Sequence, residues 1–219
     1  MSVDIDDAAG KEEERYIDAA RRGDLASFNW LVLRYQTRVY NLCYRMLYDT
    51  DAAADATQET FLSAYKAIGR FQGGQFRSWV LRIASNACLD MIRARKRRPT
   101  QSLDHVEGGQ FDEDVEPLQV ADLDRSVDPE AQALSAEVAE GIQSALDLLP
   151  DDQRMAIILV DVQGLSYEEA AAITGANLGT VKSRINRARA RLRDTLRAAG
   201  IIPGGEELSM RGERSISDG

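Results

Sequence analysis

Apolar side chains recur every three or four residues through most of this chain, and no segment alternates apolar with polar residues as a half-buried β-strand does. The last long segment shows the spacing most clearly, because its apolar residues step by three or four from Leu178 to Leu196. Such spacing places one apolar stripe along an α-helix. The sequence therefore predicts an all-α protein.

Seven segments have this helical spacing, and residues that commonly begin or end helices lie between them. Gly69 and Gly164 suit the carboxyl end of a helix, whereas Pro150 is tolerated at the start of one. The predicted helices span residues 26–47, 52–68, 77–97, 130–148, 151–162, 166–173 and 178–199. In the second of these helices, four apolar residues are expected to point inward, namely Phe61, Leu62, Tyr65 and Ile68.

Charge divides the chain into blocks that its net charge of −9 conceals. Residues 99–140 contain twelve acidic residues and one basic residue, whereas residues 70–98 and 178–197 are strongly basic. A long acidic stretch with few apolar residues does not bury enough surface to fold by itself. We therefore expect two small helical domains joined by a flexible linker. The expected parts are a disordered terminus at 1–12, a first domain at 13–99, an acidic linker at 100–129, a second domain at 130–199 and a flexible tail at 200–219.

Several classes of protein are excluded by composition. The chain has one histidine and two cysteines, Cys43 and Cys88, which are too far apart for a CxxC motif, so neither a disulfide scaffold nor a metal site is expected. Both cysteines fall on apolar stripes and are expected to be buried. No segment has the run of about 18 to 20 apolar residues that crosses a membrane. We expect a cytoplasmic protein without a bound cofactor.

The segment from residue 165 to 196 has the pattern of a helix-turn-helix. Ser166 and Glu169 form a capping box, Gly175 interrupts the chain, and Leu178 opens a helix with seven basic residues and one acidic residue. A solvated helix usually has acidic partners for its basic residues, so this imbalance favours DNA binding over a merely solvated face. The expected base-reading residues are Thr180, Lys182, Ser183, Arg184 and Arg187, and the later arginines are expected to contact phosphates.

A second basic cluster ends the predicted helix 77–97, and an aromatic loop precedes that helix. Single-stranded nucleic acid binds where bases stack on aromatic rings and cations follow the backbone. Phe71 and Phe76 in the loop are candidates for stacking, whereas Trp79 is expected in the core. The basic cluster contains Arg93, Arg95, Lys96, Arg97 and Arg98. The acidic and polar segment 51–59 either complements a helix dipole or forms a docking face for a basic partner helix.

Four segments together resemble the extracytoplasmic-function (ECF) group of bacterial sigma factors, which have only regions two and four. For region two, the similar segments are AADATQETFLSAY at 53–65 and FRSWVLRIASNACLDMIRARKRR at 76–98. For region four, they are LPDDQRMAIILVDVQGLSYEEAAAITG at 149–175 and LGTVKSRINRARARLR at 178–193. Asn177 stands where many relatives have proline, and asparagine is a good helix cap.

The resemblance implies partners and a role for each predicted surface. Asp55, Gln58 and Glu59 would bind the clamp helices of the polymerase β′ subunit. Asn86, with the loop that contains Phe71 and Phe76, would hold a flipped base of the minus-ten promoter element. The second domain would bind the minus-thirty-five element and the β flap, and the acidic linker would mimic RNA. An anti-sigma factor that covers both domains is the expected regulator.

Two alternatives to a promoter-specificity subunit of RNA polymerase follow from the residues. The first is a stand-alone helix-turn-helix regulator that binds duplex DNA without polymerase. The second is an enzyme such as a nucleic-acid hydrolase, but His105 lies in the predicted linker and no pairing of a nucleophile with a base is apparent. We therefore expect a protein that is not an enzyme.

Overall fold

The computed structural model describes residues 3–97 and 129–203, which form two compact units. The N-terminal unit lies within residues 1–127 and the C-terminal unit within residues 128–219. The described residues are helical, and no strand occurs among them, as the sequence predicts. The predicted acidic linker lies almost entirely outside the described residues, as does most of the predicted tail.

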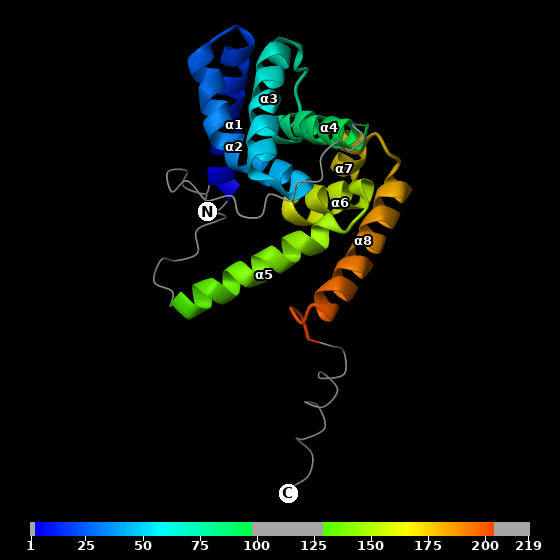
Figure 1. The fold of residues 1–219 in the computed structure, drawn as a ribbon. Helices are drawn as coiled ribbons and strands as arrows, with labels where there is room; N and C mark the ends of the chain where they lie inside the picture. The colour runs from blue at the N-terminus through cyan, green and yellow to red at the C-terminus, as the bar shows by residue number, and fades with distance from the viewer. Residues whose placement is uncertain (1–2, 98–128, 204–219) are drawn as a thin grey trace, which may run out of the picture. The chain divides into compact units, whose positions relative to one another are not determined.

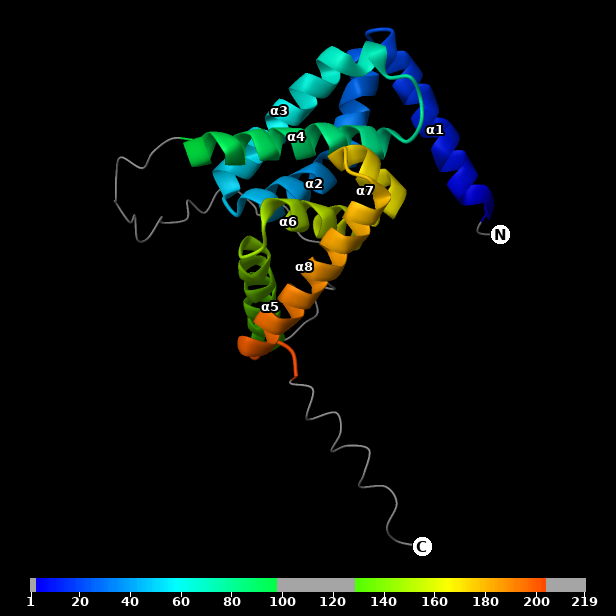
Figure 2. The ribbon, with the colours of Figure 1, turned by 90° about the vertical axis from the view of Figure 1, so that its right-hand side faces the viewer.

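The N-terminal unit is built around α2, which packs against three other helices, and α4 crosses α3 (Figures 1 and 2). Residues of α2 that face the centre are completely buried, among them Leu31, Val39 and Leu42. Cys43 of α2 and Cys88 of α4 are also buried, as expected. The elements of this unit are α1 (Val3–Arg21), α2 (Leu25–Leu47), α3 (Thr50–Ala67), the short 3₁₀ helix η1 (Ile68–Arg70) and α4 (Phe76–Arg97).

Aspartate side chains cap the amino-terminal ends of α2 and α3. The carboxylate of Asp24 accepts a hydrogen bond from the Ser27 amide at 3.1 Å, and that of Asp49 accepts one from the Ala52 amide at 2.9 Å. Each bond satisfies a backbone amide that has no partner within the first turn of its helix. These caps fix where α2 and α3 begin.

The amino terminus differs from the sequence prediction. Residues 3–12, which were expected to be disordered, form the first half of α1. Contacts to α2 hold the second half of α1: the ring of Tyr16 stacks on Trp30 with centroids 4.1 Å apart, and Glu13 accepts bonds from Arg34 at 3.0 Å and Tyr35 at 2.8 Å. The helix is therefore stabilised by polar and aromatic contacts, which its own apolar spacing does not reveal.

The C-terminal unit is arranged around α8, which packs against α5, α6 and α7 (Figure 2). Its core joins Val181, Ile185 and Ala188 of α8 to apolar residues of α6 and the segment after it, including Met155 and Ile158. The elements are α5 (Pro129–Asp147), α6 (Asp151–Ile157), the π-helical segment η2 (Ile158–Val162), α7 (Tyr167–Thr174) and α8 (Leu178–Ala198). Among residues 3–97 and 129–203, no helix is both long and apolar enough to span a membrane.

Candidate nucleic-acid interface

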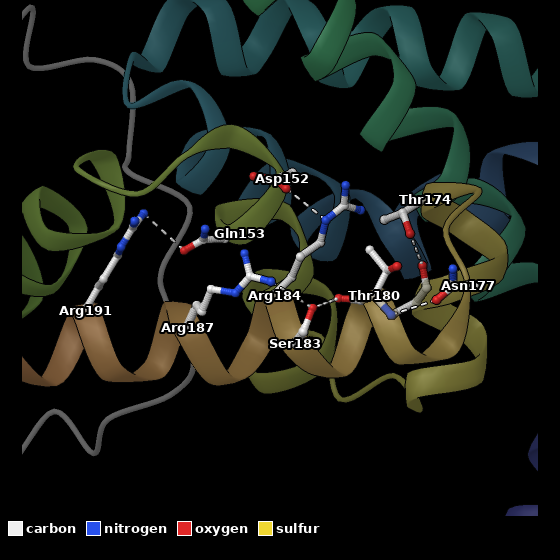
Figure 3. Close-up of polar contacts among 10 residues, drawn as sticks. Asp152, Gln153, Thr174, Asn177, Thr180, Ser183, Arg184, Arg187 and Arg191 are labelled. Atoms are coloured by element: carbon white, nitrogen blue, oxygen red, sulfur yellow. Dashed lines mark hydrogen bonds and ion pairs between the residues drawn. The ribbon is translucent and has the colours of Figure 1, made fainter.

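The predicted helix-turn-helix is formed by α7, a three-residue turn and α8. The Ser166 side chain caps α7 by accepting a bond from the Glu169 amide at 3.1 Å, and Glu169 accepts one from the Ser166 amide at 2.8 Å, which confirms the predicted capping box. Gly175 ends α7 with φ of +65°, a conformation that glycine adopts without strain. The Asn177 side chain then caps α8 by accepting a bond from the Thr180 amide at 2.8 Å (Figure 3).

The five predicted base-reading residues lie on the polar surface of α8, outside the buried stripe of Val181, Ile185 and Ala188. Lys182 and Arg187 are exposed, whereas Thr180, Ser183 and Arg184 are partly buried. Ser183 donates a bond to the Thr180 carbonyl at 2.9 Å and accepts one from Arg187 at 3.3 Å (Figure 3). The first turns of α8 therefore present a connected group of hydrogen-bonding side chains.

Two residues in the first turn of α6 hold arginines of α8. The Arg184 Nε lies 2.8 Å from Oδ2 of Asp152, and the Arg191 Nη1 donates to Oε1 of Gln153 at 3.3 Å (Figure 3). The Arg184 side chain is 26% exposed and that of Asp152 is 48% exposed. Sequence reasoning did not find these contacts, because the partners are far apart along the chain and no local pattern connects them.

Arg189, on the opposite flank of α8, makes a two-pronged pair with Asp161. Its Nε and Nη2 lie 2.9 and 2.6 Å from the two carboxylate oxygens. The hydrogen bonds to Asp161 raise the pKa of Arg189 above its usual value. The sequence pattern predicts that the later arginines contact phosphates, but in the structure Arg189 is already paired with Asp161.

The basic end of α4 is exposed in the N-terminal unit. Arg93 lies 3.0 Å from Asp90, and Arg95 lies 2.8 Å from Asp49. The exposed basic residues at this end include Arg93, Arg95, Lys96 and Arg97, and Asn86 is exposed earlier on the same helix. Arg98 lies outside the described residues.

Phe71 and two aromatic residues at the start of α4, Phe76 and Trp79, form a cluster with Tyr35 of α2. Phe71 and Phe76 are only 5% and 1% exposed, with their ring centroids 5.9 Å apart. Trp79, which was expected in the core, is partly exposed and lies 5.2 Å from Phe71. The two phenylalanine rings are therefore not open to a stacking base in this structure, because the ring of Tyr35 closes the cluster from α2 at 5.3 Å from Phe76.

The predicted docking face of α3 is larger than the sequence indicated. Asp55, Gln58 and Glu59 are exposed, and so is Leu62, at 46%. Leu62 and Tyr65 were expected to point inward, but Leu62 is exposed, and Tyr65 is 42% exposed although its ring lies 5.0 Å from that of the buried Phe28. The buried face at this end consists of Thr60, Phe61, Ala64 and Ile68. Helical spacing from Asp55 and Glu59 places Leu62 on their face, and this signal could have identified it.

Within the described parts of the chain, no three histidine, cysteine, aspartate or glutamate side chains come together as a possible metal site.

Comparison with known proteins gives matches over most of the chain. Residues 31–98 match the family Sigma-70 region 2, and residues 139–192 match Sigma-70, region 4. The chain is 36% identical over 180 residues to the RNA polymerase sigma-H factor of Pseudomonas aeruginosa, covering 82% of this chain and 91% of that protein. It is 38% identical over 175 residues to the ECF RNA polymerase sigma-E factor of Escherichia coli K12, covering 79% and 88%. The solved structure of the sigma factor RpoE with the anti-sigma factor NepR from Bartonella quintana aligns with a TM-score of 0.59 and 28% identity, covering 79% of this chain and 98% of that chain.

Proposed function

Because the chain belongs to the family of ECF RNA polymerase sigma factors, we propose that it binds core RNA polymerase and directs transcription from promoters with minus-ten and minus-thirty-five elements. The observation that carries this proposal is the occurrence of two separate basic helical surfaces, at the end of α4 and along α8. Each surface suits a different part of a promoter. The polymerase would supply the catalysis, and this chain would act without bond chemistry of its own.

The C-terminal unit would read the minus-thirty-five element as duplex DNA. An α-helix fits the major groove, and recognition helices place their first turns nearest the base edges. The connected side chains at the start of α8 are suited to this task, since arginine and lysine bind guanine and hydroxyl groups bond to several bases. The proposed contacts are made by Thr180, Lys182, Ser183, Arg184 and Arg187.

The N-terminal unit would bind the melted minus-ten element. The exposed cations at the end of α4 would follow the DNA backbone, and Asn86 would contact an unpaired base. Because Phe71 and Phe76 are buried, we propose that they support the shape of the loop before α4, and that Trp79 is the aromatic ring with an accessible surface. The proposed cations are Arg93, Arg95, Lys96 and Arg97.

The exposed face of α3 would bind the clamp helices of the β′ subunit. Its acidic and polar residues, Asp55, Gln58 and Glu59, precede the exposed Leu62 on the same helix. An exposed apolar residue beside polar residues is suited to a protein interface, whose core is more apolar than its rim. The C-terminal unit would contact the β flap, and residues 100–129 would follow the path of RNA through their negative charge.

An anti-sigma factor is the proposed regulator. The sigma factor RpoE of Bartonella quintana, which is similar to this chain over both units, was solved in complex with the anti-sigma factor NepR. A regulator that covers the exposed face of α3 together with the basic surfaces would compete with both polymerase and DNA. We propose a cytoplasmic location, because core polymerase and promoter DNA would both be bound there.

Reconstitution of core polymerase with the purified chain tests the proposal. Transcription should start at a defined set of promoters, and Arg187→Ala should reduce initiation roughly five- to tenfold at promoters that need the minus-thirty-five element. Arg15→Ala, on α1, is the control for loss of one positive charge. If the chain binds promoter duplexes tightly without polymerase and never associates with the core enzyme, the stand-alone regulator replaces this proposal.

A further inference from the structure

The pair between Asp152 and Arg184 places a carboxylate beside a proposed DNA-reading arginine. Phosphates repel carboxylates, so an interface selected only for affinity would not keep an aspartate there. The pair is also partly open to solvent and contributes little to folding. A carboxylate in the first turn of α6 also complements the helix dipole, but that role does not require an arginine partner, and it therefore leaves the contact with Arg184 unexplained.

The geometry of the contact provides an explanation. Asp152 holds Arg184 through Nε, and Figure 3 shows the two terminal nitrogens on the side of the guanidinium away from the carboxylate. Arg189 contrasts with this, because Asp161 engages both Nε and one terminal nitrogen of that side chain. Arg184 thus keeps both terminal nitrogens for another acceptor, whereas Asp161 already engages one of the two terminal nitrogens of Arg189.

We propose that Asp152 is a positioning residue for promoter recognition, which fixes the Arg184 guanidinium so that its terminal nitrogens meet the edge of one preferred base. A free arginine side chain must lose rotamer freedom on binding, whereas a side chain that is already held in an ion pair has lost part of that freedom. The carboxylate also offsets the charge of Arg184, which weakens its attraction to DNA of any sequence. Asp152 therefore favours discrimination between DNA sequences at the expense of total affinity for DNA.

The neighbouring contact extends this arrangement. Gln153, which is 5% exposed, accepts a bond from Arg191 on the same flank of α8. The first turn of α6 thus holds two arginines that are two helical turns apart (Figure 3). Unlike Gln153, Asp152 carries a charge. Removal of the Asp152 carboxylate would therefore change both the orientation of Arg184 and the net charge of this surface.

The inference rests on the proposed function, and the experiment uses holoenzyme assembled from core polymerase and the full chain. Initiation is measured on a promoter with its mapped minus-thirty-five element and on variants of that element with single base pairs replaced. The discrimination is the amount of initiation on the mapped element divided by the amount on a variant element. We expect Asp152→Ala to reduce this ratio about tenfold, and Arg184→Ala to reduce it equally. The double variant should show no further loss, because both changes remove the same contact.

Two further variants separate orientation from charge. Asp152→Asn keeps an oxygen acceptor for Nε and should retain most of the discrimination, although it lacks the charge. Asp194→Asn removes a carboxylate from α8 that pairs only with the exposed Arg193 among the described contacts, and it should raise binding to all DNA without changing the ratio.

Three results would overturn the inference. The first is that Asp152→Asn and Asp152→Ala behave alike: both bind every DNA sequence more tightly, and both leave the discrimination ratio unchanged. The second is independent, multiplying effects of Asp152→Ala and Arg184→Ala. The third is a wild-type holoenzyme that ignores the minus-thirty-five element, and this result alone would also reject the proposed function.

Discussion

Asp49 joins the start of α3 to the basic end of α4: its Oδ1 accepts a bond from the Ala52 amide at 2.9 Å, and its Oδ2 lies 2.8 Å from Arg95 Nη2. One carboxylate thus caps a helix and also fixes one of the cations proposed to bind DNA. The bond from Ala52, followed by the contact with Arg95, lowers the pKa of Asp49 below its usual value. Folding of the N-terminal unit is therefore linked to pH.

The pH dependence is the first prediction. A carboxyl group with a lowered pKa in the folded state stabilises the protein above its unfolded pKa of about 3.9 and loses that contribution as pH falls through the folded value. Asp49→Asn should therefore flatten the decline in stability between about pH 5 and pH 3. Urea unfolding followed by tryptophan fluorescence measures this, because both tryptophans, Trp30 and Trp79, lie in the N-terminal unit.

A matched variant distinguishes the effect of the two bonds of Asp49 from the general effect of a negative charge at the start of α3. Asp51→Asn removes a carboxylate from the first turn of α3 and leaves both bonds of Asp49 in place. If Asp51→Asn flattens the profile as much as Asp49→Asn does, the capping explanation is wrong.

Arg154 gives a prediction about the C-terminal unit. Its side chain is 8% exposed, and it binds Asp147 Oδ1 at 2.7 Å and the Leu149 carbonyl at 3.3 Å, which joins the end of α5 to α6. Arg154→Met should cost about 2 to 3 kcal/mol, because it leaves buried carbonyl groups without a charged donor. The melting temperature of this unit should fall by on the order of 10 °C.

The two units can be distinguished in that measurement. Circular dichroism reports helix in both units, whereas tryptophan fluorescence reports only the N-terminal one. We expect Arg154→Met to shift part of the dichroism transition and to leave the fluorescence transition unchanged. Arg193→Met, which removes an exposed pair with Asp194, is the control and should change stability by less than about 1 kcal/mol. Equal losses in the two variants would refute the role of Arg154.

Glu13 supports a prediction about α1. Burial, together with the hydrogen bond to Glu13, raises the pKa of Tyr35 to about 12. In Glu13→Ala we expect this pKa to move down toward 10 and the Trp30 emission to shift to longer wavelength, since α1 no longer holds Tyr16 against the indole. Ultraviolet titration of tyrosinate and hydrogen exchange of the α1 amides measure these changes. An unchanged exchange rate would mean that other contacts keep α1 in place.

Leu62 gives a prediction about binding to polymerase. Its side chain is exposed and contributes little to the core, so Leu62→Ala should leave the melting temperature unchanged. Affinity for core polymerase should fall roughly tenfold, as is common for a central apolar contact. Leu25→Ala, which truncates another exposed leucine at 55% exposure, is the control, and competition for labelled core enzyme is the measurement. Equal affinities of the two variants would reject α3 as the docking face.

Apart from α1, the α-helices of both units could be predicted from the sequence because their signals are local. The capping box at Ser166 and Glu169, the glycine turn and the Asn177 cap all lie within a few residues of the helices they define. Apolar spacing also identified the buried face of α8. These features determine the helix-turn-helix before any long-range contact forms.

The remaining features depend on contacts between distant parts of the chain. α1 has little apolar spacing and is held by Trp30, Arg34 and Tyr35 of α2. Burial of Phe76 requires Tyr35, which lies two helices earlier. The pairing of Arg184 with Asp152 depends on how α6 crosses α8. Helical periodicity does not encode such crossings, so the sequence could name Arg184 but not its partner.

The central claim is that this chain selects promoters for core RNA polymerase. The most direct test is to map transcription starts on whole genomic DNA with core enzyme alone and with core enzyme plus the purified chain. We predict a set of new starts that appears only with the chain and shares two sequence elements upstream. If start positions are the same in both reactions, the account is contradicted.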